Sequence, residues 1–171
     1  MRRESGFDVL YSILLLIILS ATSPAQDLKP APRELLKEVE VPAILKAKPL
    51  QEDPKDDELR KLLKSRYNEA VTETTVVYVQ YVRINGRLDS FIDATQRLLK
   101  AGLELHENLT EQVTLLTQYM ELIKDTEKVA KQRNDSGQSN PSELPKARYY
   151  RLDAEIQLLR AKRQADKIRE K

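Results

Sequence analysis

The sequence predicts an all-α protein made of two tandem helical hairpins, and three observations support that prediction. A polar turn that contains Gly and leads into a helix with an Ala and Leu seam occurs twice, once from Asn85-Gly86 and once from Ser136-Gly137. Apolar residues recur at heptad spacing around both turns, which is typical of a helix laid along another helix. The composition, with 33% charged residues, 5% aromatic residues and no Trp, favours long helices over a sandwich or barrel.

The two copies keep a constant offset, because 53 residues separate Ala94 from Ala147 and also Leu105 from Leu158. A fixed period of this size indicates a duplicated supersecondary unit that cannot bury its apolar stripe alone. We therefore expect four helices, packed in a coiled-coil-like antiparallel manner. The repeated seam positions are Ala94, Leu99, Ala101 and Leu105 in the first copy and Ala147, Leu152, Ala154 and Leu158 in the second.

The first 25 residues read as a signal peptide. Met1-Arg2-Arg3 precedes an apolar stretch over 9–19, and small residues follow up to Ala25, where we expect the cleavage. The stretch is short for a membrane span, which needs about 20 residues, although an uncleaved anchor is the alternative. The protein is thus expected to be exported, to the periplasm or cell envelope, with membrane association possible through this segment.

Residues 26–56 are rich in Pro, which removes backbone donors and favours extended conformations. We expect a disordered linker that tethers the helical domain at 57–171. The alternative is a docking peptide that uses Val41, Ile44 and Leu45.

The first helix is expected to begin near Asp57, although the β-branched run over 74–79 would favour a strand in isolation. Heptad spacing on both sides of the run decides for a helix. The second helix is expected to begin at Asp89 as its N-cap and to break near His106. Asn108 then resembles the start of a capping box for the third helix.

The fourth helix is expected after the loop over 134–141, with Pro141 at its start and Pro145 early enough to be tolerated. Its seam is rich in Ala, so we expect it to approach its neighbour closely.

A family resemblance is carried by the segment from Asp89 to Ala101, which follows a Gly turn and has an Asp, apolar, Asp, Ala pattern with a further Ala seven residues later. This segment resembles the hairpin tips of TolC-type outer-membrane efflux proteins, and the segment from Gly137 to Ala154 is similar. The resemblance implies periplasmic hairpins whose tips dock an adaptor. The tip residues that it singles out are Asn85, Gly86, Arg87, Ser136, Gly137 and Gln138.

The chain also departs from that family in two respects. Helices of about 25 residues reach only about 38 Å, far less than a periplasmic tunnel requires. No amphipathic strands of the kind that form an outer-membrane barrel are recognisable. Transport activity is therefore not expected, although the hairpin architecture is.

Residues that could carry chemistry are few. The chain has no Cys and a single His, His106; this His could ligate a metal beside Glu104 and Glu107, but a solvated capping role is the simpler interpretation. The net charge of +2 is the small difference between 29 basic and 27 acidic side chains, so nucleic acid is not expected as a partner. The basic C-terminal end could touch anionic lipid, but complementing the helix dipole is the simpler role.

No catalytic, cofactor or metal residue is therefore predicted. We expect a non-enzymatic coiled-coil protein with a structural, scaffolding or adaptor role, which binds a protein partner or associates with itself through its helices. The alternative is a component or degenerate relative of a TolC-like efflux system.

Overall fold

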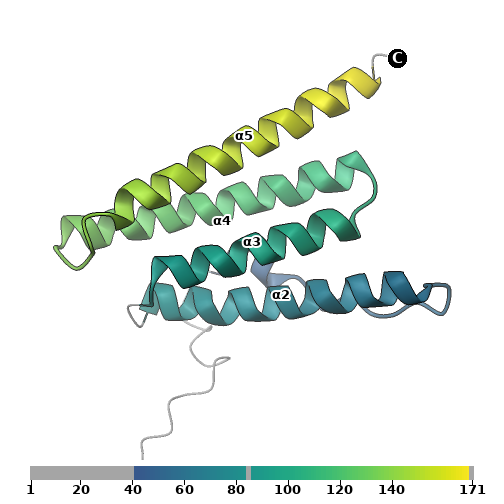
Figure 1. Cartoon of the computed structure of the whole chain (residues 1–171), viewed down its shortest axis with the longest axis horizontal. Helices are drawn as coiled ribbons and strands as arrows, with labels where there is room; N and C mark the ends of the chain where they lie inside the picture. Colours follow the sequence, from purple (N-terminus) through teal and green to yellow (C-terminus); the bar gives the residue numbers. More distant parts are fainter. Residues whose placement is uncertain (1–40, 84–85, 170–171) are drawn as a thin grey trace, which may run out of the picture. The chain divides into compact units, whose positions relative to one another are not determined.

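The helices of the protein are arranged as two consecutive hairpins (Figure 1). The computed structural model describes residues 41–83 and 86–169, and this part of the chain contains no β-strand. Helix α2 pairs with α3, α4 pairs with α5, and α3 also packs against α4. The predicted all-α fold with two tandem hairpins is confirmed. The elements are the 3-10 turn η2 (Ala43–Lys46) and the helices α2 (Glu58–Arg83), α3 (Leu88–Leu105), α4 (Leu109–Asp135) and α5 (Glu143–Arg169).

The β-branched run over 74–79 lies inside α2, as the heptad spacing predicts. The hydroxyls of Thr74 and Thr75 each donate to the carbonyl four residues earlier, at 2.7 Å, so these polar groups are satisfied within the helix. The Thr74 hydroxyl also lies 3.2 Å from the carbonyl oxygen of Ala94 in α3. Long-range packing therefore outweighs the weak local preference of this run for a strand.

Asn108 caps α4 in the way that the sequence indicates. Its side-chain oxygen accepts a hydrogen bond from the backbone N–H of Glu111 at 2.8 Å. The Glu111 carboxylate does not complete a capping box; it lies 3.0 Å from Nδ1 of His106 instead.

The start of α3 differs from the prediction, which was wrong in making Asp89 the N-cap. Helix α3 begins at Leu88, and Arg87 occupies the N-cap position without a side-chain capping bond. Asp89 lies in the first turn, where its carboxylate accepts a bond from Lys146 of α5 at 2.6 Å. An acidic group there still complements the helix dipole, but its partner comes from the other hairpin, which the local sequence does not reveal.

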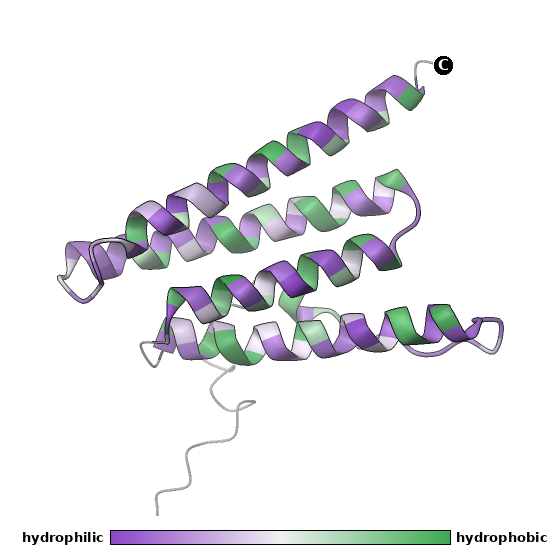
Figure 2. Ribbon diagram, viewed as in Figure 1, coloured by the Kyte–Doolittle hydropathy of each residue, from purple (hydrophilic) through white to green (hydrophobic). Residues whose placement is uncertain are grey.

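The core combines aliphatic side chains with five aromatic ones and is concentrated on α3, which buries ten of its residues. The four repeated Ala residues of the seam are all buried, and their small side chains let the helix pairs approach closely. The two copies differ in burial at one repeated position: Leu99 in α3 is 7% exposed, whereas Leu152 in α5 is 49% exposed. Figure 2 shows hydrophobic segments recurring along all four helices, α5 included.

Residues 41–56 are not the free tether that the sequence predicts for 26–56. Val41, Ile44 and Leu45 are buried, and η2 packs against both α2 and α4. These are the residues that the sequence proposes for a docking peptide, and in the structure they dock on the chain's own helices. The reason is that three apolar side chains between prolines gain more from covering the core than from solvation.

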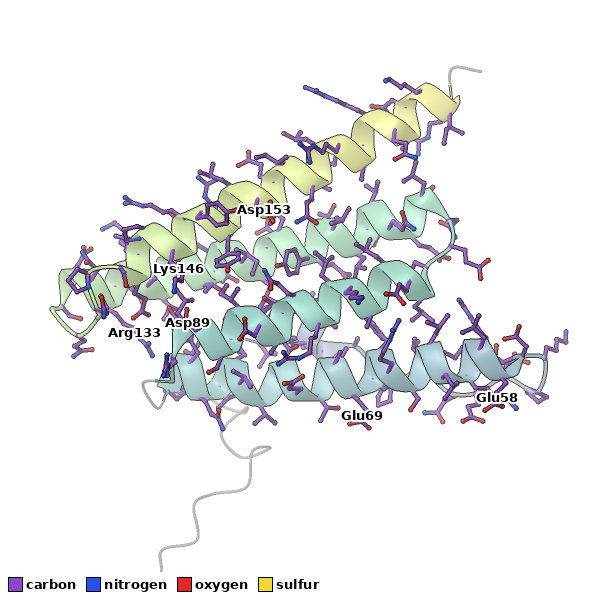
Figure 3. The ribbon with its side chains drawn as sticks, viewed as in Figure 1. Glu58, Glu69, Asp89, Arg133, Lys146 and Asp153 are labelled. Atoms are coloured by element: carbon purple, nitrogen blue, oxygen red, sulfur yellow. The ribbon has the colours of Figure 1, made fainter. Side chains whose placement is uncertain are left out.

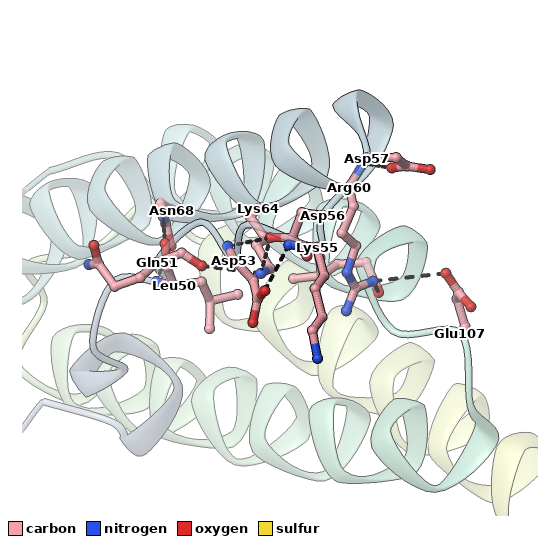
Figure 4. A network of polar contacts seen from close by, with 11 residues as sticks. Leu50, Gln51, Asp53, Lys55, Asp56, Asp57, Arg60, Lys64, Asn68 and Glu107 are labelled. Atoms are coloured by element: carbon pink, nitrogen blue, oxygen red, sulfur yellow. Dashed lines mark hydrogen bonds and ion pairs between the residues drawn. The ribbon is translucent and has the colours of Figure 1, made fainter.

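A polar network fastens the following residues to α2 (Figure 4). The side-chain amide of Asn68 makes two hydrogen bonds of 2.9 Å with the backbone of Leu50. Lys64 forms an ion pair with Asp56 and donates to the carbonyl of Gln51 at 3.1 Å. The backbone of this segment therefore finds fixed partners despite its Pro content.

The signal peptide predicted for 1–25 and the first part of the predicted linker lie outside the described residues. Within 41–83 and 86–169, no helix combines the length and the hydropathy that a membrane crossing requires.

Candidate functional site

The two turns that the sequence singles out lie at the same end of the helical unit. One turn joins the end of α2 to the start of α3, and the other joins the end of α4 to the start of α5. Figure 3 shows Asp89, Arg133 and Lys146 grouped at this end. Residues 86–87, 133, 136–138, 143 and 146 are called the turn end below. Of the six predicted tip residues, Asn85 alone falls outside the described residues.

The turn at Gly137 is closed by backbone hydrogen bonds. The N–H of Gln138 donates to the carbonyl of Arg133 at 2.8 Å, and the N–H of Gly137 donates to the carbonyl of Asn134 at 3.0 Å. This pair of bonds is a Schellman motif, which needs a left-handed residue between the helix and the loop. Gly137 supplies it with a φ of +69°, a conformation that costs any residue with a Cβ atom.

The turn at Gly86 needs glycine for a different reason, which is close approach. Its N–H donates to the carbonyl of Gln80 at 2.8 Å. A Cβ atom at position 86 would lie 2.7 Å from the carbonyl carbon of Gln80 and 2.8 Å from the backbone nitrogen of Tyr81. Those are backbone atoms of α2, so no side-chain rotation could relieve the contact.

Arg133 is the buried residue that joins the two turns, and it is only 9% exposed. Its guanidinium donates to the carbonyl of Tyr81 and to the carbonyl of Gly86 at 3.3 Å. The same group lies 3.4 Å from the carboxylate of Glu143 and 4.4 Å from the centre of the Tyr81 ring. One charged side chain thus satisfies the end of α2, the first turn and the start of α5 together.

The Tyr81 ring that lies against the Arg133 guanidinium is itself fully buried, and the exclusion of water makes the electrostatic contacts of the arginine stronger. The Tyr81 ring stacks on Phe91 with 5.5 Å between ring centres, and its hydroxyl donates to Glu143 at 2.9 Å. Burial, with the Glu143 carboxylate as a further cause, raises the pKa of the Tyr81 hydroxyl above its ordinary range. Tyr81 therefore stays a neutral donor throughout the physiological pH range.

A second ion pair joins the hairpins nearer the surface. Lys146 of α5 lies 2.6 Å from Asp89 of α3, and this contact lowers the pKa of the Asp89 carboxyl and raises the pKa of the Lys146 ammonium. Both side chains are about half exposed, so solvent screens the pair.

The outward side of the turn end is formed by the predicted tip residues. Arg87, Ser136, Gly137 and Gln138 are exposed, and Gly86 is half-buried. The sequence did not point to Arg133, because an Arg near a helix C-terminus is ordinarily a solvated partner of the dipole. A usable signal was its position within a helix turn of the apolar seam, at Ala130.

The possible metal site around His106 is not assembled. Within the described residues no group of three or more His, Asp or Glu side chains is placed to hold a metal ion. His106 contacts Glu111, while Glu104 lies 2.5 Å from Arg66 and Glu107 lies 4.0 Å from Arg60.

The shallow surface between α2 and α3 is likewise occupied by ion pairs. It is lined by Arg66, Glu73, Arg97 and Lys100, and the Arg97 guanidinium binds the Glu73 carboxylate through two nitrogens, at 3.0 and 2.6 Å. Arg66 is in turn paired with Glu104, so two ion pairs connect α2 with α3 on this exposed surface.

The turn end thus presents exposed turn residues over a buried arginine. Comparison with protein-family models, curated proteins and solved structures finds no match to the chain.

Proposed function

We propose that the protein is a non-enzymatic helical scaffold or adaptor of the cell envelope and that its turn end contacts a protein partner. The observation that carries this proposal is the pairing of the two turns by Arg133, which links Tyr81, Gly86 and Glu143. A rigid, preorganised surface loses little conformational entropy when it binds. Exposed loops on a rigid helical support are also where binding residues concentrate.

Site-specific photo-crosslinking in cells that express the full chain tests this proposal. A photoreactive residue is placed at Arg87 or at Gln138 in the turn end, and at Gln118, an exposed Gln on α4, as the matched control. We expect both turn-end positions to yield the same discrete adduct with another protein, and the control position to yield none. Adducts from Gln118 alone, or equal adducts from all three positions, would contradict the proposal.

Export is part of the proposed role and has its own test. The support is the basic start, the apolar stretch over 9–19 and the small residues up to Ala25. We expect a C-terminal alkaline phosphatase fusion to be active and the mature chain to begin at Gln26. An inactive fusion with an intact Met1 would reject export, while leaving the turn end as a contact surface inside the cell.

The second candidate function is a component of a TolC-like efflux system. It is favoured by the placement of both Gly turns at one end, since docking of hairpin tips to an adaptor requires this arrangement. Size-exclusion chromatography with light scattering separates the two candidates. A trimer, or affinity for membranes, would favour the efflux component. A chain that neither forms a trimer nor binds membranes would favour the scaffold.

A further inference from the structure

Helix α5 has two apolar faces on opposite sides, and only one of them is covered. The inner face packs against α4 through Leu144, Ala147, Ala154 and Leu158. The opposite side, called the outer face below, is 46–65% exposed at each of its four large apolar residues. These four are Tyr149, Leu152, Ile156 and Leu159, and their spacing of three, four and three residues is that of a heptad seam.

The internal repeat shows what such a face does when it has a neighbour. Leu99 is the equivalent of Leu152, and it is buried on the side of α3 that packs against α4. Two contacts mark that side: Thr95 is hydrogen-bonded to Tyr119 of α4, and Gly102 lies against Leu115. The side of α5 that carries Leu152 therefore matches a covered side of α3 at this position, but no helix lies on it within the described residues.

We propose that the outer face of α5 binds the outer face of α5 in a second copy of this chain, with the two helices parallel. This inference rests on the proposed scaffold role and adds a partner to it, but it uses residues outside the turn end. The occupant is identified by the charges that flank the apolar stripe.

In a parallel pair, the flanks of the two helices are complementary. On one flank of the apolar stripe, Arg148 and Glu155 each come one residue before an apolar position, Tyr149 and Ile156 respectively. On the opposite flank, Asp153 and Arg160 each come one residue after an apolar position, Leu152 and Leu159 respectively. A parallel arrangement places Arg148 against Asp153 of the second copy and Glu155 against Arg160 of the second copy. The two-fold symmetry repeats both contacts, so the pair gains four attractive contacts.

The antiparallel alternative brings like charges together. With the apolar stripes fully overlapped, Glu155 faces Glu155 of the second copy and Asp153 faces Asp153 of the second copy. Beyond them, Arg148 faces a second-copy Lys162. Repulsion along both flanks therefore disfavours this orientation.

The remaining geometry also permits the parallel pair. The inner and outer faces are on opposite sides of α5, so the other helices of each copy lie away from the contact. Arg148 is about half exposed even though it lies 3.5 Å from Glu127 of α4, so its guanidinium is accessible to a second carboxylate. Helix α5 is already ordered by its packing against α4, so association does not require a further loss of conformational entropy to form the helix.

Lysines limit the length of this contact. After Leu159, a parallel pair would bring Lys162 against Lys167 of the second copy, which is repulsive. The seam thus spans about two heptads, and we expect a dissociation constant in the micromolar range.

Sedimentation equilibrium of the full chain, from about 1 to 200 μM, tests the proposal. We expect a reversible monomer–dimer equilibrium, and we expect the double variant L152Q/I156Q to weaken it by about a hundredfold. Gln keeps the helix propensity, and both positions are exposed, so circular dichroism should be unchanged. The matched control is L59Q/L62Q, which changes two exposed leucines of α2 and should leave the dimer intact.

A wild-type chain that stays monomeric over this range would overturn the proposal. So would a dimer that L59Q/L62Q weakens and L152Q/I156Q does not. If the wild type is monomeric and binds phosphatidylglycerol vesicles through the same two α5 residues, the outer face belongs to a membrane instead. None of these outcomes affects the photo-crosslinking at the turn end, so the two proposals fail separately.

Two further variants test the orientation. The chain has no Cys, so L152C should form a disulfide-linked dimer on mild oxidation when the helices are parallel. We expect E155K to weaken the dimer by about tenfold, and E155K/R160E to restore it by exchanging the charges. A dimer that crosslinks only when L152C is mixed with I156C would show the antiparallel arrangement and would overturn this part of the proposal.

Discussion

Helices α3 and α5 follow the two Gly turns and share the same Ala and Leu seam, yet their burial differs greatly. Helix α3 buries ten of its 18 residues, whereas α5 buries four of its 27. The reason is the number of neighbours: α3 packs against α2 and α4, while α5 packs mainly against α4. A repeated sequence thus specifies the contact inside each hairpin, but whether the second face is covered depends on which other helix packs on it, as α4 does on α3.

The strongest test of this difference in burial is to truncate Leu99 and Leu152, the repeated pair whose exposure differs. We expect Leu99→Ala to lower the free energy of unfolding by about 2–4 kcal/mol, because it removes buried methyl groups and leaves a cavity. Leu152→Ala should change it by less than about 0.5 kcal/mol. Urea unfolding at low protein concentration, followed by far-UV circular dichroism, measures both. Equal effects would mean that the two helices are covered alike.

The next largest effect should come from the contact that couples the hairpins. Arg133→Gln leaves Glu143 and the carbonyl of Tyr81 without the guanidinium that binds them. We expect a loss of about 3 kcal/mol. The matched control is Arg148→Gln, an exposed Arg paired with Glu127, which should lose less than about 1 kcal/mol. Similar losses in both variants would show that Arg133 acts as an ordinary surface charge.

Substitution of the two turn glycines tests whether the two hairpin turns need glycine for different reasons. Gly86→Ala forces a Cβ atom into the backbone of Gln80 and Tyr81, and we expect it to cost about 2 kcal/mol. At Gly137 nothing lies within 4 Å of an added Cβ atom, so Gly137→Ala pays only for its positive φ, about 1 kcal/mol. Thermal and urea unfolding should rank the two variants in this order. The reverse order would mean that the first turn is free to move away from α2.

The smallest effect should be the pH dependence of the exposed pair between α3 and α5. Lys146 lowers the pKa of the Asp89 carboxyl, so the pair stabilises the fold fully above about pH 4, the ordinary pKa of Asp. The contribution is lost as the pH falls through the lower folded-state pKa. We expect Asp89→Asn to be slightly less stable than the wild type at about pH 7 and equal to it near pH 2.

A double-mutant cycle with Lys146→Met checks that assignment. The effect of Asp89→Asn should shrink in the Lys146→Met background, since the two side chains lose the same contact. A small residual effect is expected there, because Arg87 lies 3.6 Å from the Asp89 carboxylate and the helix dipole also acts on it. An effect of Asp89→Asn that is equally large in both backgrounds would show that Lys146 is not the partner that matters.

Much of the fold follows from local patterns. The β-branched run over 74–79 is helical as the surrounding heptads require, and Asn108 caps α4 through Glu111. Gly137 lies in the loop that the sequence predicts, where it adopts a positive φ. These features depend on neighbours within a few residues along the chain, so the sequence contains what is needed to foresee them.

The turn end was predictable only in part. Its exposed residues were identified from the repeat, but Arg133 was not, because its acceptors on Tyr81 and Gly86 lie about fifty residues earlier in the chain. The placement of Asp89 failed for a similar reason, since its partner Lys146 belongs to the other hairpin. Asp89 does not differ in local pattern from an ordinary helix-terminal charge, and the local signal for Arg133 is limited to its position three residues after Ala130 of the apolar seam.

The sequence by itself determined the helices, the two Gly turns and the seam that closes each hairpin, because helical periodicity and turn conformation are properties of adjacent residues. The tertiary structure alone decided which second faces are covered: Leu99 buried and Leu152 exposed, and Ile44 folded back onto α2 and α4. The physical reason is that burial depends on which elements meet in space, and two positions with the same local pattern can meet different neighbours.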